Sequence, residues 1–221
     1  MNLRMERDFM DKKRIVEETK QYVMQKSYGE GSGHDWWHIE RVYHLAKLIA
    51  SKEKANLFVV EMAALLHDLD DWKFSNNNFR ATENYLLSVN ISPRERDDIM
   101  NIIKTMSFKG GVTESRQKSM EGKIVQDADR LDAMGAIGIA RAFTYGGYRN
   151  QPIYDPHIEP RNFTSVEEVK ELKNHTVNHF YEKLFKLKDL MNTETAKEIA
   201  NRRHRYMETF LKEFYSEWNQ R

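Results

Sequence analysis

Residues that interrupt helices are scarce in this chain. Only four prolines and ten glycines occur among its 221 residues. Between them, apolar side chains recur three or four positions apart, which is the period of a helix with one buried face. The predicted fold class is therefore all-α. The first helix is expected to end near 29–33, and further helices cover about 36–49, 57–69, 79–86, 93–106, 115–131, 135–143, 165–187 and 196–218.

Several helix starts carry local capping signals. Ser92 followed by Pro93 is a strong start, and Ser165 with Glu168 has the spacing of a capping box. Residues 75–78 offer further serine and asparagine caps. Residues 145–164, in contrast, contain two glycines and three prolines, so a long loop is expected there, with a lid over a functional site as its candidate role.

Composition excludes several classes of protein. The 35 lysines and arginines nearly balance the 34 aspartates and glutamates, so no stable nucleic-acid complex is expected. The absence of cysteine excludes disulfides and thiolate ligands, so a metal site has to use histidine and carboxylate side chains. No apolar run approaches the roughly 20 residues that span a bilayer, and the charged start lacks a signal-peptide core. A cytoplasmic protein without a membrane partner is expected.

Four residues separated by long gaps offer ligands for one divalent metal. His38 stands alone, His67 and Asp68 end an apolar stretch, and Asp129 lies three residues before Asp132 in a second apolar stretch. A lone histidine on a helix is most often structural, but charged groups next to a core are costly to bury without a partner. A cation removes that cost, so the set predicts a metal site built from nitrogen and oxygen.

Three segments carry a resemblance to a known family. They read HDWWHIERV, ALLHDLDD and QDADRLDAMGAIGIAR, and they resemble the H, HD and D motifs of the HD-domain superfamily of metal-dependent phosphohydrolases. The later segment HFYEKLFKLKDLMNT and the chain length are similar to the small bacterial stand-alone HD hydrolases, of nucleotide pyrophosphatase type. The resemblance implies one HD-type domain over 1–221, a helical bundle with a metal-site core at about 20–145, the lid-like loop 145–164 and additional C-terminal helices at 165–218.

The resemblance also assigns the ligands. It gives His38, His67, Asp68 and Asp129 to the metal, the last because ADRL is where the family places its final ligand, with Asp132 as its competitor. None of the eight histidines falls between Asp68 and Asp129, where two-metal relatives place extra ones, so a single ion is expected. Mn²⁺ is the expected ion, with Ni²⁺, Co²⁺, Fe²⁺ and Mg²⁺ as alternatives.

Three polar residues near these motifs are candidates for catalysis. Asp71 follows His67 by four residues, so on a continuing helix it would orient or deprotonate the attacking water. Its alternative is a surface ion pair with Lys73, which is itself a candidate for neutralising phosphate charge. His34 lies one helical turn before His38 and either contacts the substrate or caps the helix.

Seven residues are candidates for substrate binding. Lysines and a hydroxyl suit phosphates, although single lysines are more often solvated, and Arg41 alternatively holds a ligand carboxylate in place. Tyr148 either stacks on a base or packs, and His179 either reaches the pocket mouth with Lys183 or is structural together with His175. The set is Lys104, Ser107, Lys109, Arg41, Tyr148, His179 and Lys183.

The resemblance implies hydrolysis of a nucleoside or deoxynucleoside triphosphate through a metal-bound water, with pyrophosphate as one candidate product. The ligand residues alone do not select this substrate class. The alternative is a regulatory module that binds a nucleotide or metal with little chemistry. The expected partner is a small phosphorylated substrate. The aromatic residues of the last helix would also suit a homodimer contact.

Overall fold

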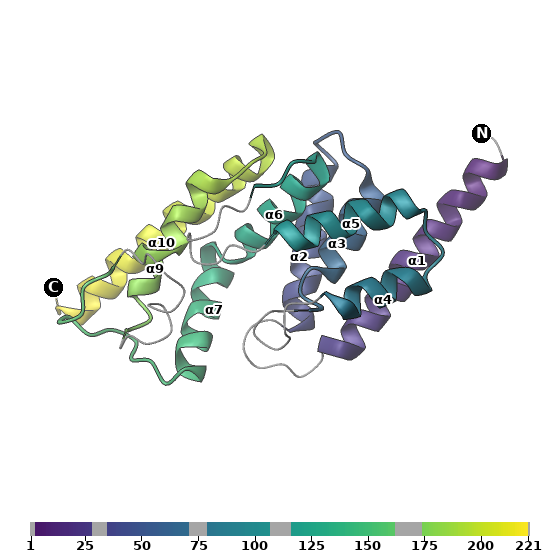
Figure 1. Cartoon of the computed structure of the whole chain (residues 1–221). Helices are drawn as coiled ribbons and strands as arrows, with labels where there is room; N and C mark the ends of the chain where they lie inside the picture. Colours follow the sequence, from purple (N-terminus) through teal and green to yellow (C-terminus); the bar gives the residue numbers. More distant parts are fainter. Residues whose placement is uncertain (1–2, 28–34, 71–78, 107–115, 162–173, 221) are drawn as a thin grey trace. The chain divides into compact units, whose positions relative to one another are not determined.

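The computed structural model describes residues 3–27, 35–70, 79–106, 116–161 and 174–220. All regular structure in these ranges is helical, which confirms the all-α prediction (Figure 1). The described residues form two compact units, one made of those up to 106 together with 116–126, and the other of those from 127 onward. The prediction of a single domain stays a prediction. Within the described ranges, no helix combines the length and apolarity needed to cross a bilayer.

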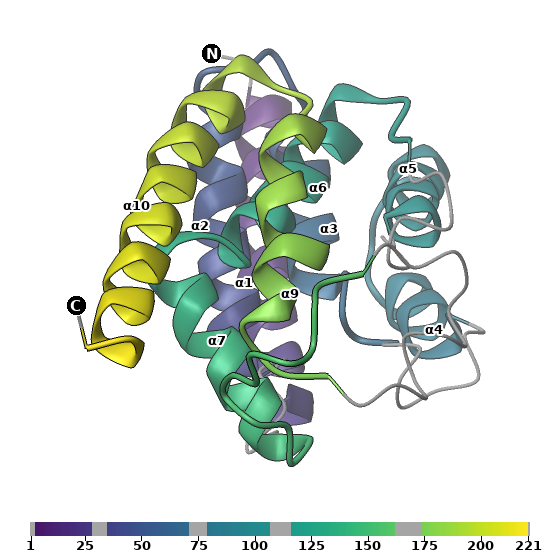
Figure 2. The same cartoon turned by 90° about the vertical axis from the view of Figure 1, so that its left-hand side faces the viewer.

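The first unit is organised around α3 (Leu57–Leu66), on which α1 (Leu3–Ser27), α2 (Trp36–Ala50) and α5 (Pro93–Thr105) pack (Figures 1 and 2). A helix that is apolar on nearly all sides belongs in an interior. Helix α4 (Arg80–Ser88) packs on α5, and the first part of α6 (Met120–Asp132) completes the unit. The buried residues of α3 are Phe58, Val59, Val60, Met62, Ala63, Ala64, Leu65 and Leu66.

The second unit contains the end of α6, α7 (Gly135–Tyr148), α9 (Asn178–Glu182), the 3-10 helix η1 (Leu184–Leu190) and α10 (Glu194–Trp218). Helix α10 packs on α7 and η1, and Figure 2 shows α7, α9 and α10 running side by side. Phe180 and Phe210 stack with their ring centroids 6.1 Å apart. Gly146 permits the close approach of Thr176, because a Cβ at that glycine would lie only 2.0 Å from the threonine hydroxyl oxygen.

Several predicted helix ends are confirmed. Helix α2 begins at Trp36, and α5 begins after a full capping box in which Ser92 accepts from the backbone of Glu95 and the Glu95 side chain accepts from Ser92. The last helix ends at Trp218 as expected, with Thr193 as its N-cap. The proposed caps at 75–78 and the capping box at 165–168 lie outside the described residues.

Four predicted boundaries are wrong. Helix α6 begins at Met120, not near residue 115. Helix α3 ends at Leu66, and α7 continues to Tyr148 into the expected loop. The helix expected over 165–187 is absent from 174–177, because the N–H groups of Thr176 and Val177 donate to the carbonyl oxygens of Pro152 and Ile153 (3.0 and 3.1 Å). Those bonds replace the ones that a helix would make. From Leu184 the chain winds as a 3-10 helix.

Candidate metal centre

Three of the four predicted metal ligands converge within the first unit. The Nε2 atoms of His38 and His67 lie 3.3 Å apart, and an Asp68 carboxylate oxygen lies 3.4 Å from the first and 3.7 Å from the second. Two imidazole nitrogens and a carboxylate oxygen thus face one point. This donor set suits a first-row divalent cation better than Mg²⁺, which prefers oxygen ligands.

Local helix signals position these side chains. Asp35 is the N-cap of α2 and accepts from the backbone N–H of His38 at 3.0 Å, which fixes the first turn of the helix that carries this ligand. Helix α3 ends with His67 as its C-cap residue, and Asp68 follows in a turn. His67 and Asp68 therefore come directly after α3, the helix on which the other helices of the unit pack.

The hydrogen bond of the His67 ring determines which nitrogen is available to a metal. Its Nδ1 lies 2.8 Å from the carbonyl oxygen of Ala64. A carbonyl oxygen can only accept, so Nδ1 carries the proton and Nε2 of the neutral ring carries the lone pair. That lone pair points toward His38 and Asp68. Such a backbone bond on the far ring nitrogen is the usual support of a metal-binding histidine.

Burial makes a cation more favourable at this point. The side chains of His38 and His67 are 1% and 4% exposed, and that of Asp68 is 18% exposed. Two imidazole nitrogens and a carboxylate oxygen that face one point are donors of the kind that bind a divalent ion. The attraction of such an ion would also offset part of the hydration that these groups lose on burial, so the residues present fit a metal.

Asp70 supports the same turn and was missed by sequence reasoning. This buried carboxylate accepts from the backbone N–H groups of Ala81 and Thr82 at 3.1 and 2.8 Å. It thereby caps α4, whose own N-cap residue, Phe79, makes no side-chain capping bond. Asp70 precedes Arg80, the first residue of α4, by ten positions, so the sequence pattern of a local N-cap does not reveal this cap.

The remaining predicted ligand, Asp129, lies on α6 in the second unit and is half-buried. Its competitor Asp132 is buried and pairs with Arg141 at 2.9 Å. Asp127 is fully buried and accepts four hydrogen bonds from Asn192 and Thr193. Both neighbouring aspartates are therefore engaged inside the second unit.

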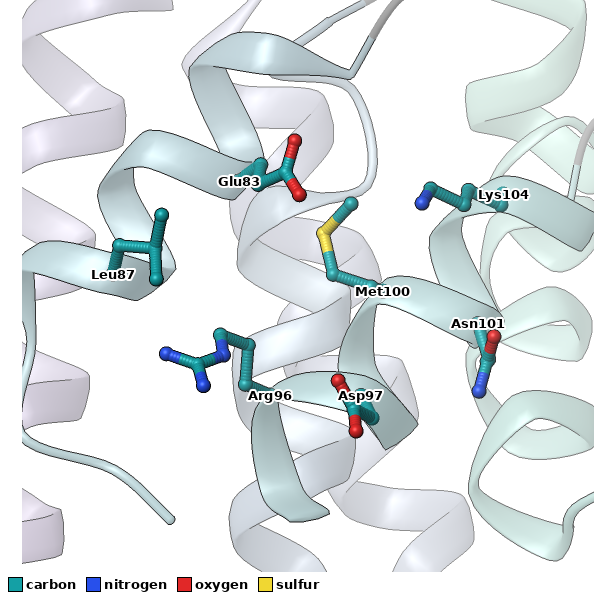
Figure 3. A pocket seen from close by; sticks show the side chains of 7 residues that line it. All are labelled: Glu83, Leu87, Arg96, Asp97, Met100, Asn101 and Lys104. Atoms are coloured by element: carbon teal, nitrogen blue, oxygen red, sulfur yellow. The ribbon is translucent and has the colours of Figure 1, made fainter. Parts of the chain in front are cut away.

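The substrate-binding candidates of the first unit lie on α2 and α5. Arg41 is half-buried, three residues after His38. Lys104 is exposed and borders a cavity of about 260 Å³ between α4 and α5. Figure 3 shows the side chain of Met100 between those of Glu83 and Lys104. The predicted ligands do not line this cavity. Its lining residues are Glu83, Leu87, Arg96, Asp97, Met100, Asn101 and Lys104.

The candidates of the second unit differ in their surroundings. Tyr148 ends α7 and is 62% exposed. His179 lies in α9, and burial, with a smaller effect of the Lys183 charge, lowers its pKa to about 3. Its ring is therefore neutral at pH 7. His175 accepts from the Asn178 N–H through Nδ1 at 3.2 Å and donates from Nε2 to the Ile158 carbonyl oxygen at 3.0 Å, so both ring nitrogens serve the fold.

The catalytic candidates His34, Asp71 and Lys73, and the substrate-binding candidates Ser107 and Lys109, lie outside the described residues. Their predicted roles stay predictions.

Comparison with known proteins identifies the family. The HD-domain sequence profile matches residues 36–134, which include all four predicted ligands. YpgQ of Bacillus subtilis is 40% identical over 202 residues, which cover 90% of this chain and 91% of YpgQ. The structure of YpgQ in complex with ADP has a TM-score of 0.74 at 37% identity and covers 91% of this chain and 97% of that one.

Two further solved structures agree. A protein from Lactobacillus plantarum has a TM-score of 0.84 at 41% identity, covering 93% of this chain and 97% of its own. An HD-superfamily hydrolase from Bacillus thuringiensis has a TM-score of 0.76 at 43% identity, covering 95% of this chain and all of its own. The chain therefore belongs to the HD-domain family of hydrolases, as one of its small stand-alone members.

Proposed function

We propose that this protein is a metal-dependent phosphohydrolase that acts on nucleoside or deoxynucleoside triphosphates. The observation that carries the proposal is the convergence of His38, His67 and Asp68, in which the bond from Nδ1 of His67 to Ala64 makes Nε2 the unprotonated ring nitrogen. A site made of these donors binds one divalent ion. Mn²⁺ is our expected ion, and Ni²⁺, Co²⁺, Fe²⁺ and Mg²⁺ are the alternatives.

Asp129 is the proposed fourth ligand. It stands in the ADRL sequence at which the resemblance places the last ligand, and the family profile includes it. Helix α6 runs without a break from the first unit, where Gln126 donates to the Met106 carbonyl oxygen at 3.4 Å, to Asp129 one turn later.

When bound, the ion would supply a water of lowered pKa and polarise a phosphoryl oxygen. Asp71 is proposed to orient that water and accept its proton, His34 to contact the substrate, and Lys73 to neutralise phosphate charge. Lys104, Ser107, Lys109 and Arg41 are proposed phosphate contacts, and Tyr148 and Lys183 contacts to the rest of the nucleotide. His179 would contribute through a neutral ring, because its pKa is lowered to about 3.

The relative bound to ADP supports the substrate class. YpgQ is 37% identical in that structure and carries a nucleoside diphosphate. ADP consists of an adenine, a ribose and two phosphates, and adenosine triphosphate contains all of these groups. The proposal does not extend to the scissile bond, because release of phosphate or pyrophosphate differs only in where the phosphate chain lies.

The test is a turnover assay with defined metals. Chelator-treated protein is supplied with Mn²⁺ and a panel of nucleoside and deoxynucleoside mono-, di- and triphosphates, and the products are separated by chromatography. Turnover of triphosphates is expected for the natural chain and for His44→Ala, an exposed histidine on the ligand-bearing helix α2. It is expected to be lost in His67→Ala and Asp68→Asn. Equal turnover in all four proteins would refute the mechanism, and silence across the panel in the natural chain would favour a binding module.

A further inference from the structure

Asp127 is a carboxylate whose hydrogen-bonding capacity is fully used. Oδ1 accepts from the backbone N and side-chain Nδ2 of Asn192 at 2.9 and 2.8 Å. Oδ2 accepts from the backbone N and the hydroxyl of Thr193 at 2.8 and 2.9 Å. The side chain is completely buried. Four donors on one buried carboxylate join α6 to the two residues before α10, all within the second unit.

The capping of α10 does not by itself require this contact. Thr193 already accepts from the Ala196 N–H at 3.2 Å through its own hydroxyl oxygen and so acts as the N-cap. A negative charge near a helix N-terminus is favourable, but that benefit is available to any nearby acid. What Asp127 adds is a tether between two helices that are more than sixty residues apart in sequence.

A second tether lies one turn later on α6. Arg130 donates to the carbonyl oxygen of Leu190, the last residue of η1. Asp127 and Arg130 are three residues apart, so they lie on the same face of the helix. That face is therefore held against residues 190–193 by a carboxylate and a guanidinium together.

Asp129 lies on another face. Successive helical residues are rotated by roughly 100°, so positions two apart are separated by about 200°. A helix held through Asp127 and Arg130 thus presents Asp129 on the side away from the tether. The tether limits how far the helix can roll or slide, and roll is the motion that would displace the Asp129 carboxylate most.

We propose that Asp127 is a positioning residue for the metal site, which acts by fixing the rotation of α6 and hence the direction of Asp129. This inference rests on the proposed role of Asp129 as a ligand. It assigns a function in metal binding to a residue that is not itself a proposed ligand. Supporting partners of this kind typically change metal affinity by about tenfold to a hundredfold when they are removed.

The experiment measures the affinity for Mn²⁺ by calorimetry, as the ion is titrated into the metal-free full chain. The variants are Asp127→Asn, which keeps one acceptor oxygen, Asp127→Ala, and Asp129→Ala. Leu187→Ala, a buried residue of η1, is the control for loss of stability in the same unit, and Thr193→Ser keeps the hydroxyl donor. Circular dichroism at the titration temperature establishes that each variant is folded.

We expect Asp127→Asn and Asp127→Ala to bind Mn²⁺ about tenfold more weakly or worse. Thr193→Ser and Leu187→Ala should bind as the natural chain does. If Asp127→Ala does not fold, Asp127→Asn decides the question. Natural affinity in the Asp127 variants, or an equal loss in Leu187→Ala, overturns the positioning role. Natural affinity in Asp129→Ala would instead contradict the proposed ligand, so the two failures are distinguishable.

Discussion

The ring of His67 is held by the carbonyl oxygen of Ala64, one turn earlier on α3, at 2.8 Å from Nδ1. The bond makes Nδ1 the donor and fixes the rotation of the ring. Because Ala64 is itself fully buried, the orientation of the ligand is determined by the core of the first unit.

Metal binding should raise the thermal stability of the protein through this histidine. Free Mn²⁺ at about a hundred times its dissociation constant is expected to stabilise the fold by about 2.7 kcal/mol, because it binds the folded chain. The increase in melting temperature should vanish in His67→Ala and persist in His44→Ala. Thermal unfolding with and without Mn²⁺ measures it. An undiminished increase in His67→Ala would remove this residue from the site.

Loss of the Asp70 carboxylate should destabilise the first unit. Asp70→Ala leaves the N–H groups of Ala81 and Thr82 without this acceptor, and loss of a capping side chain typically costs about 0.5–2 kcal/mol. Urea unfolding of the metal-free protein gives the difference in unfolding free energy. Asp97→Ala, on the adjacent helix α5, is the surface control and should change it by less than about 0.5 kcal/mol. A smaller effect at Asp70 than at Asp97 would contradict the capping role.

His179 should make the fold less stable in acid. Its pKa is lowered from 6.5 to about 3, so between these values the unfolded chain takes up a proton that the folded chain does not. The contribution of the neutral His179 ring to the free energy of unfolding is therefore complete above about pH 6.5. It is lost as the pH falls toward 3. In that window the slope of unfolding free energy against pH should be lower in His179→Gln by at most about 1.4 kcal/mol per pH unit. Urea unfolding at several pH values tests this, and equal slopes would mean that the ring is protonated in the fold.

The core position Leu65 should be far more sensitive than the exposed Leu57 on the same helix. Leu65 is completely buried, and Leu57 is 46% exposed. Truncation of a buried leucine to alanine typically costs about 2–5 kcal/mol, whereas surface changes stay within about 0.5 kcal/mol. Chemical unfolding of Leu65→Ala and Leu57→Ala compares them. Similar losses at both positions would show that α3 is not the centre of the unit.

The helices that could be predicted are those with local signals. The start of α5 follows from Ser92 and Pro93, and the helical period of α2 follows from its apolar residues. The segment before α9 could not be predicted, because its backbone bonds go to Pro152 and Ile153, more than twenty residues away. Sequence patterns report only on neighbours along the chain.

The same distinction applies to the candidate site. His38, His67 and Asp68 could be found because imidazoles and a carboxylate beside apolar stretches are chemically conspicuous. Asp70 was missed because its partners are backbone N–H groups, which every residue but proline carries. Asp127 was missed because its partners, the backbone and side chains of Asn192 and Thr193, lie more than sixty residues away in sequence. The identity of these partners cannot be read from the residues next to either aspartate.

The burial of α3 bears on how this protein can evolve. Of its ten residues only Leu57 and Glu61 lie outside the core, so nearly every substitution there has to conserve volume and polarity. The helix that precedes His67 therefore tolerates few neutral substitutions. New substrate preferences among descendants of this chain would therefore arise from substitutions in other segments. His67 and Asp68, which follow this helix, would keep their positions because the helix before them changes little.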